Sequence, residues 1–296
     1  MHVELCRTRT SDGLSLCGLL TRPDETVQPT LPVDAFLLVH GTASNFYAGG
    51  VLETFAKQAV AAGAAVLRVN TRGHDQMAAI PGERGSFAGG AAYECIAECC
   101  FDLTAWADLL ANRGYSQIAL VGHSMGAVKS IFAQARAAHR LVRCVIGISP
   151  PRFCHARLAS GTGGDEFLDD FRRACEFVDE GRGGELISVR YPLPLMLTAD
   201  GFLAKYGPHD DYDIVRHLPA VDCPTLIVLG TGSVAVSSAF AGLPEEIQRL
   251  AVEHSRLALE LVDGANTVYS ACEDVPFLRA AAWWSGSHGA LPVGFG

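Results

Sequence analysis

The stretch at residues 118–126, which reads Ile-Ala-Leu-Val-Gly-His-Ser-Met-Gly, most constrains what this chain can fold into. Its four apolar residues predict a buried strand, and the small-residue pattern after Gly126 predicts a helix. A Gly-x-Ser-x-Gly motif therefore falls at a sharp strand-to-helix turn, where a strained backbone lifts the Ser124 hydroxyl out of the sheet. The helix N-terminus behind the serine offers unpaired N–H groups and positive potential, so an oxyanion formed at Ser124 would be stabilised.

Buried strands alternate with helices along the rest of the chain. Continuous apolar runs predict strands at 35–39, 65–69, 142–149, 225–230 and 259–262. Apolar spacings of three and four predict helices at 51–62, 93–113, 245–255 and 277–284. An Asp-Gly turn predicts a hairpin of strands at 3–8 and 14–21, whereas the Gly-rich residues 76–91 are expected to form a loop. This alternation predicts an α/β protein with a mostly parallel sheet covered by helices on both faces.

One polar segment, 152–220, interrupts the series of predicted strands. It falls between two strands of the sheet, where an insertion above their carboxyl ends is placed to roof a pocket. We therefore expect a core made of 1–151 and 221–296, with a cap at 152–220. The tail from Ser285 is Gly-rich and is expected to be mobile.

Composition excludes several classes of function. The net charge is −9 with acids and bases interspersed, which argues against a nucleic-acid surface and against docking on anionic lipid. No apolar run reaches the ~18 residues that a membrane span needs, and the first residues form no apolar signal region. The 10 cysteines sit inside apolar strands and helices, where cysteine packs as a small hydrophobe. We expect a cytoplasmic protein with reduced thiols and no metal site.

Over roughly residues 1–285 the chain resembles the α/β-hydrolase superfamily. The resemblance rests on the elbow at 122–126, the His40-Gly41 loop, the Asn-Thr-Arg-Gly turn at 70–73, the hairpin start, the cap and two closing strands. It implies an α/β-hydrolase fold with a cap insertion. It also implies an oxyanion hole, whose two N–H groups map to Thr42 (or Ala43) and Met125.

Two positions depart from the family's pattern. A serine hydroxyl is a poor nucleophile until a base takes its proton and a carboxylate holds that base. The family places the carboxylate just after the strand at 225–230, where this chain has Ser233, and the histidine after the last strand, where it has Thr267. The turn at 149–151, which can hold the acid instead, has none. The resemblance thus implies a retained serine and oxyanion hole without the usual base.

Several histidines could supply a displaced base. His74 is the best placed, because it follows a sheet strand at the carboxyl end, where pockets form; a structural hydrogen bond to Asp75 is the alternative role. His209 lies in the cap, His254 in a predicted helix and His288 in the tail. Residues expected to bind substrate around Ser124 are His40, which shapes the oxyanion loop, then Asn45, Phe46 and Tyr47 at the pocket mouth, and His123, whose side chain should point away from Ser124.

Three functions follow from this pattern. An oxyanion hole without a triad suits isomerisation, cyclisation, elimination or decarboxylation of a carbonyl compound, with Ser124 as a hydrogen-bond donor. A displaced base would instead give a serine esterase, thioesterase or acyltransferase. The third is a non-catalytic ligand receptor. All three place a small, largely apolar carbonyl compound beneath the cap. We expect no cofactor and no nucleic-acid or membrane partner, and a homodimer is compatible with the sequence.

Overall fold

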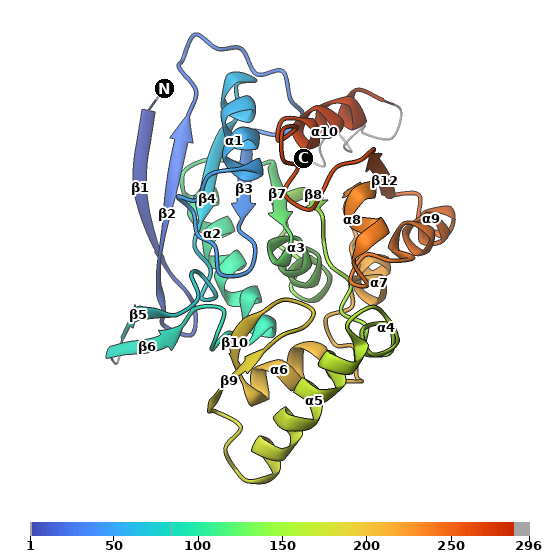
Figure 1. Cartoon of the computed structure of the whole chain (residues 1–296). Helices are drawn as coiled ribbons and strands as arrows, with labels where there is room; N and C mark the ends of the chain where they lie inside the picture. Colours follow the sequence, from blue (N-terminus) through green and yellow to red (C-terminus); the bar gives the residue numbers. More distant parts are fainter. Residues whose placement is uncertain (1, 84, 287–296) are drawn as a thin grey trace.

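A central sheet organises the protein (Figure 1). The computed structural model describes residues 2–83 and 85–286, and within them eight strands pair in the order β1-β2-β4-β3-β7-β8-β11-β12. The strands from β4 to β12 run parallel, and β2 pairs antiparallel with both β1 and β4. Their bounds are β1 (His2–Arg9), β2 (Ser15–Arg22), β3 (Ala35–Val39), β4 (Ala65–Val69), β7 (Ile118–His123), β8 (Val142–Ile148), β11 (Thr225–Gly230) and β12 (Leu257–Val262).

Helices cover both faces of this sheet, so the predicted α/β-hydrolase fold class is confirmed. Alternate residues of β3 divide between two apolar clusters, as the two-residue period of a strand requires. Phe36 and Leu38 pack with α1 (Val51–Ala61) and α10 (Val275–Ser285) on one face. Leu37 packs in the cluster of the other face, which holds α2 (Cys99–Asn112), α3 (Met125–Arg136) and α9 (Leu243–Glu253).

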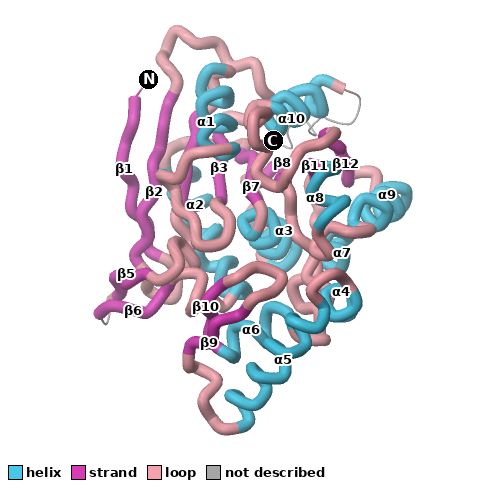
Figure 2. Tube along the Cα trace, viewed as in Figure 1, coloured by secondary structure: helices cyan, strands magenta, loops and turns pink. Residues whose placement is uncertain are grey.

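The segment proposed as a cap lies beyond the carboxyl ends of β3 and β7 (Figure 1). It is mainly helical, with one small hairpin (Figure 2). Its elements are α4 (His155–Ser160), α5 (Gly164–Asp179), β9 (Leu186–Val189), β10 (Leu195–Thr198), α6 (Ala199–Tyr206), α7 (Ile214–His217) and the short 3-10 helix η2 (Leu218–Ala220). The rings of Phe167, Phe202 and Tyr206 pack together in its core. The backbone N–H of Thr198 bonds to the carbonyl of Ala92, which ties the cap to the core.

The loop predicted at 76–91 is wrong, because two strands pair there: β5 (Ala78–Gly82) and β6 (Gly85–Gly89). The glycines that suggested a loop make room for neighbouring side chains. A Cβ on Gly82 would overlap the ring of Phe87, and one on Gly89 would overlap the side chain of Ile80. The Gly-rich composition therefore reflects packing within a hairpin.

One further prediction fails at an element end. The helix predicted at 93–113 begins only at the 3-10 turn η1 (Ile96–Glu98), because Glu94 turns inward to form an ion pair with Lys129. After β11 the chain forms the short helix α8 (Thr231–Val236). The tail from 287 onward, including His288, lies outside the described residues. No helix in the described ranges has the length and apolar character needed to cross a bilayer.

A buried ion pair anchors the turn after β4. Arg72 is 6% exposed, and its Nη2 donates to Asp102 Oδ1 on α2 at 2.8 Å. The backbone N–H of Arg72 donates to Oδ2 of the same carboxylate, also at 2.8 Å. Glu98 and Asp12 contact Nη1 at 2.7 and 2.9 Å. The Asn-Thr-Arg-Gly turn is therefore fixed to α2 and to the N-terminal hairpin.

Arg72→Met should lower the free energy of unfolding by about 3–5 kcal/mol, because it leaves the fully buried Asp102 carboxylate without its cation. Urea denaturation followed by circular dichroism measures this loss. Arg249→Met is the control, since that arginine is 58% exposed in its side chain, and its effect should stay within about 0.5 kcal/mol. Equal midpoints for the two variants would contradict the assigned role of Arg72.

Candidate active site

Ser124 occupies a sharp turn between β7 and α3. Its backbone has φ 53° and ψ −120°, a left-handed conformation that L-residues rarely adopt, and its N–H donates to the Ile148 carbonyl at 2.8 Å. The flanking glycines allow this turn to pack closely. A Cβ on Gly122 would overlap the carbonyl of Gly126, and a Cβ on Gly126 would overlap the carbonyl of Val39. The turn therefore holds the serine at the edge of the sheet with little room to relax.

A cavity of about 340 Å³ lies over Ser124. Its lining includes six residues that the sequence placed at the site: His40, Thr42, Asn45, His123, Ser124 and Thr267. Phe46 and Tyr47 are not part of the lining; their rings pack edge to face at 5.2 Å, and Tyr47 is 64% exposed. The cavity is thus built from the loop after β3, the elbow and the loop after β12.

Two backbone segments border the serine where the oxyanion hole was expected. A side chain at position 41 would place its Cβ 3.3 Å from the Cβ of Ser124, so the loop carrying Thr42 passes directly over the elbow. Ala43 in this loop has φ 53°. Met125 is the first residue of α3, where a backbone N–H has no acceptor within the helix. These segments give the site N–H groups and the positive end of a helix dipole.

Ser233 and Thr267, at the two positions where the resemblance placed the acid and the histidine, contact each other. Ser233 Oγ lies 2.9 Å from Thr267 Oγ1, so a pair of neutral hydroxyls occupies the place expected for the acid and the histidine. The Thr267 carbonyl in turn accepts a hydrogen bond from His123 Nε2 at 2.8 Å. Within the part of the chain that the structure describes, no titratable side chain is hydrogen-bonded to Ser124 Oγ.

His123 lines the same cavity as Ser124, although its Nε2 turns toward Thr267. Donation from Nε2 leaves Nδ1 with a free lone pair, and Nδ1 would lie 3.6 Å from a Cβ at position 41. Burial lowers the pKa of His123, so the ring is neutral at physiological pH. His123 is therefore a hydrogen-bond acceptor beside the serine.

His74 has the carboxylate partner that a catalytic imidazole needs. Its Nδ1 lies 2.9 Å from Asp75 Oδ2, and Asn45 Nδ2 donates to Asp75 Oδ1 at 2.7 Å. Burial raises the pKa of the Asp75 carboxyl, but the hydrogen bonds from Asn45 and His74 lower it overall. The bond to Asp75 leaves Nε2 of His74 free to accept a proton. Only Asn45 of this trio is part of the cavity lining, so Asp75 lies between that lining and His74 in the series of hydrogen bonds.

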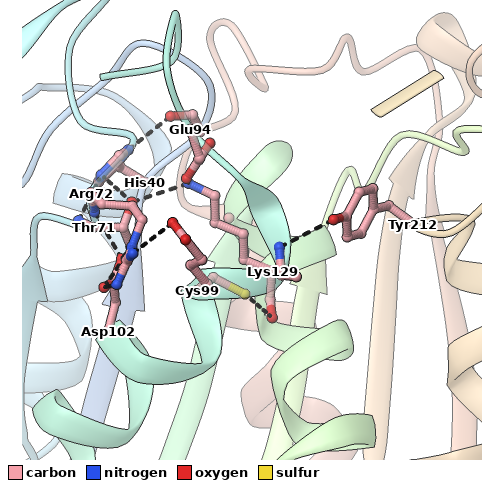
Figure 3. Close-up of polar contacts among 12 residues, drawn as sticks. His40, Thr71, Arg72, Glu94, Cys99, Asp102, Lys129 and Tyr212 are labelled. Atoms are coloured by element: carbon pink, nitrogen blue, oxygen red, sulfur yellow. Dashed lines mark hydrogen bonds and ion pairs between the residues drawn. The ribbon is translucent and has the colours of Figure 1, made fainter. Parts of the chain in front are cut away.

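His40 holds the oxyanion loop in place. It is 2% exposed, and its Nδ1 donates to the Gly41 carbonyl at 2.8 Å while Nε2 accepts from the Thr71 N–H at 3.2 Å. Lys129 Nζ donates to Thr71 Oγ1 at 3.0 Å and pairs with Glu94 (Figure 3). Burial and the Lys129 charge lower the pKa of His40 to about 3. With both nitrogens engaged, His40 is a positioning residue and not a base.

Of the other histidines considered, His209 and His254 are not among the lining residues of the cavity. Two charged residues of the site had not been singled out from the sequence. Arg68 lines the cavity from β4, and Lys129 is 1% exposed beneath the oxyanion loop. Each is the one charged residue in an apolar run, 65–69 or 125–133. That pattern is a usable signal, because a charge in a buried run needs a partner.

The buried His40 makes stability depend on pH. Its pKa rises from about 3 in the folded state to the ordinary 6.5 on unfolding. Below pH 6.5 the unfolded chain therefore binds a proton at His40, whereas the native state does not. The free energy of unfolding then falls by up to ~1.4 kcal/mol per pH unit. Between pH 6.5 and 5 the loss should approach ~2 kcal/mol.

Urea titrations of the wild type and of His40→Gln at pH 7, 6 and 5 measure this dependence. The glutamine amide can donate and accept but does not titrate, so the variant should lose less stability across the range. Equal pH dependence in the two proteins would show that His40 does not resist protonation in the fold.

Solved structures similar to this protein are known, whereas no curated protein sequence matches it. An esterase of Pyrococcus furiosus is similar in structure, with a TM-score of 0.63 and 15% identity over 96% of this chain and 90% of that one. The α/β hydrolase GrgF of Penicillium sp. sh18 has a TM-score of 0.66 and 16% identity, over 95% of this chain and 96% of that one. Est1E of Butyrivibrio proteoclasticus, solved with ferulic acid, has a TM-score of 0.63 and 14% identity, over 94% of this chain and 97% of that one.

At these identities the similar structures establish the fold alone. The family model described as the alpha/beta hydrolase family matches residues 36–282, which cover the sheet from β3 onward, the elbow and the cap. Because that match spans most of the chain, this protein belongs to the alpha/beta hydrolase family.

Proposed function

We propose that this protein is a non-hydrolytic enzyme of the alpha/beta hydrolase family, an isomerase, cyclase or lyase acting on a small carbonyl compound. The observation that carries the proposal is the neutral pair at the triad positions. Ser233 and Thr267 hydrogen-bond to each other at 2.9 Å, and Ser124 is left without a basic partner among the described residues. The elbow and the oxyanion loop keep their tight packing around the serine.

Magnitudes favour this role over hydrolysis. In a triad enzyme, loss of the base alone lowers kcat by a factor on the order of 10⁶, while binding and the oxyanion hole retain about 10³–10⁴ over water. Preorganised N–H donors stabilise any oxyanion, including an enolate or alkoxide, and each is worth roughly 10²–10³ in rate. A site that keeps those donors without the base is better suited to reactions in which Ser124 is not a nucleophile.

The proton transfer in such a reaction falls to His74, whose ring would have to turn past Asn45 into the cavity, because His74 is not among the lining residues. Nε2 of His74 takes a proton from the carbon next to the carbonyl, and the electron pair of that C–H bond moves onto the carbonyl oxygen. The Ser124 hydroxyl and the N–H groups of Thr42 and Met125 stabilise the resulting enolate. In a carbonyl compound with a β,γ carbon–carbon double bond, return of the proton from His74 to the γ carbon shifts that double bond to the α,β position, restores the carbonyl and completes an isomerisation. The Asp75 carboxylate, held by Asn45, stabilises the imidazolium between the two transfers.

A second candidate function is ester or thioester hydrolysis by Ser124 with a displaced base. Two observations favour it. The names of the Pyrococcus furiosus structures describe an esterase, and the His74–Asp75 pair is an imidazole braced by a carboxylate. In that case His74 would have to reach the serine itself.

The Ser124→Ala variant separates the two functions. As a hydrogen-bond donor to an oxyanion, Ser124 contributes on the order of 10²–10³ to kcat, whereas a nucleophile contributes on the order of 10⁶. We expect the smaller loss when candidate carbonyl compounds are converted and the products are followed by mass spectrometry. Ser116→Ala is the control, since that hydroxyl bonds to Asp34 and lies before β7, at the end of the strand opposite the elbow.

The same assay in ¹⁸O-labelled water should leave the product unlabelled, and millimolar fluorophosphonate should not label the wild type. Oxygen from water in the product, together with fluorophosphonate labelling that disappears in Ser124→Ala, would establish the hydrolase instead.

A further inference from the structure

Arg68 is a cation inside the Ser124 cavity. It lies on β4, where it alternates with Leu67 and Val69, so its side chain leaves the sheet on the face that carries α1. The residue is half-buried and lines the same cavity as Ser124. Its Nη2 donates to the carbonyl of Ala48 in the loop that precedes α1. The guanidinium therefore lies at the α1 end of the cavity.

This guanidinium has no carboxylate partner. Among the residues that the structure describes, no Asp or Glu oxygen lies within 4.0 Å of Arg68, whereas Arg72 on the same segment contacts three carboxylates. Glu53 is close enough to raise the pKa of Arg68, yet it forms an ion pair with Lys57 at 2.9 Å. Burial lowers the pKa of Arg68 overall. A guanidinium carries five N–H donors, and within the described residues only Nη2 of Arg68 has an acceptor, the Ala48 carbonyl.

The start of α1 adds positive potential at the same end. Gly49, Gly50 and Val51 line the cavity, and the N-cap Gly50 has φ 93° and no side chain to cap the helix. The first-turn N–H groups of this 11-residue helix thus have no side-chain acceptor at the N-cap. Next to Arg68 they form a surface suited to an anion.

The two ends of the cavity are far enough apart for one small molecule to reach both. Leu38 of β3 pairs with Arg68 on one side and with Val121 of β7 on the other, so β4 and β7 are two strands apart. Two strand spacings amount to about 10 Å. At one end lie Ser124 and the oxyanion loop, and at the other lies the unpaired guanidinium.

We propose that the cavity takes a carbonyl compound whose far end carries an anionic oxygen group, a carboxylate or a phosphate, bound by Arg68 while the carbonyl lies at Ser124. The position of the carbonyl rests on the proposed function. The anion site rests only on Arg68 and the start of α1. This adds a charged end to the largely apolar substrate expected from the sequence.

The test compares linear methyl ketones of two to six methylene groups that end in a carboxylate with the matching ketones that end in a carboxamide. The amide has nearly the same size but no charge. Dissociation constants come from isothermal titration calorimetry or ligand-observed NMR. Hydrogen bonds between ions are about twice as strong as neutral ones, so the best acid should bind wild-type protein at least about tenfold more tightly than its amide.

Arg68→Gln should reduce this acid-to-amide ratio to about one, and Arg68→Lys should keep part of it. Arg249→Gln removes an exposed charge elsewhere and should leave the ratio unchanged. Equal binding of acid and amide to the wild type overturns the proposal, as does a preference that survives in Arg68→Gln. The wild-type comparison decides the question even where Arg68→Gln does not fold.

Methyl ketones that end in a phosphonate distinguish the two sources of the anion. Tighter binding than the carboxylate of equal length supports the anion site in its phosphate form, and weaker binding supports the carboxylate form. Ser124→Ala should weaken acid and amide alike and keep their ratio. Only the acid-to-amide binding ratio can therefore contradict the anion site. The proposed function is contradicted by other results, namely labelled oxygen in the product and a loss of kcat on the order of 10⁶ in Ser124→Ala.

Discussion

The site depends on a buried chain of polar contacts that runs from Glu94 through Lys129, Thr71 and His40 to the Gly41 carbonyl (Figure 3). It joins α3, which carries the elbow, to the turn after β4 and to the loop after β3. A buried lysine is costly unless its charge is paired and its donors are used. Here the Glu94 carboxylate and the Thr71 hydroxyl meet that requirement. The oxyanion loop is consequently fixed to the same helix that presents the serine.

The elbow is held independently of positions 233 and 267. Its geometry is maintained by glycine packing and by the His40 chain, and neither involves those two positions. Those two positions remain joined by a hydrogen bond, but between hydroxyls that carry no charge. Buried polar groups need a partner, and each of these hydroxyls is the partner of the other. In the function that we propose, these are the positions of the acid and the histidine, so their replacement changes the chemistry of the serine and leaves its support intact.

Most of the sheet could be predicted from the sequence because its central strands are buried on both faces. The runs at 35–39, 65–69 and 225–230 coincide with β3, β4 and β11. The hairpin of β5 and β6 could not be found in this way, since its glycines serve side chains that only the folded chain brings together. The helix start at 93 failed for a similar reason: Glu94 is drawn inward by Lys129, 35 positions away (129 − 94).

The same contrast holds for the site, where local patterns could be predicted but contacts between distant residues could not. The motif located Ser124, and the loop residues Thr42 and Asn45 lie in its cavity. Contacts across strands decided the rest. The partner of His123 is a carbonyl 144 residues away, and Lys129 meets Thr71 58 residues away. Periodicity carries information about burial and element type, but not about which polar groups meet. Arg68 was visible as a charge in an apolar run, yet its lack of a carboxylate partner among the described residues is a property of the folded chain.

The charge distribution of the cavity connects the two proposals. Burial keeps His40 and His123 neutral by lowering the pKa of each ring, so Arg68 carries the one formal charge among the lining residues. An oxyanion that forms about 10 Å from an unpaired anionic end of the same molecule would be raised in energy by ~1.7 kcal/mol at an effective dielectric constant of 20. Arg68 would offset that repulsion by pairing with the anionic end. For a substrate with an acid group at that end, the guanidinium would thus make the oxyanion hole more effective, which links recognition of the far end to stabilisation of the enolate.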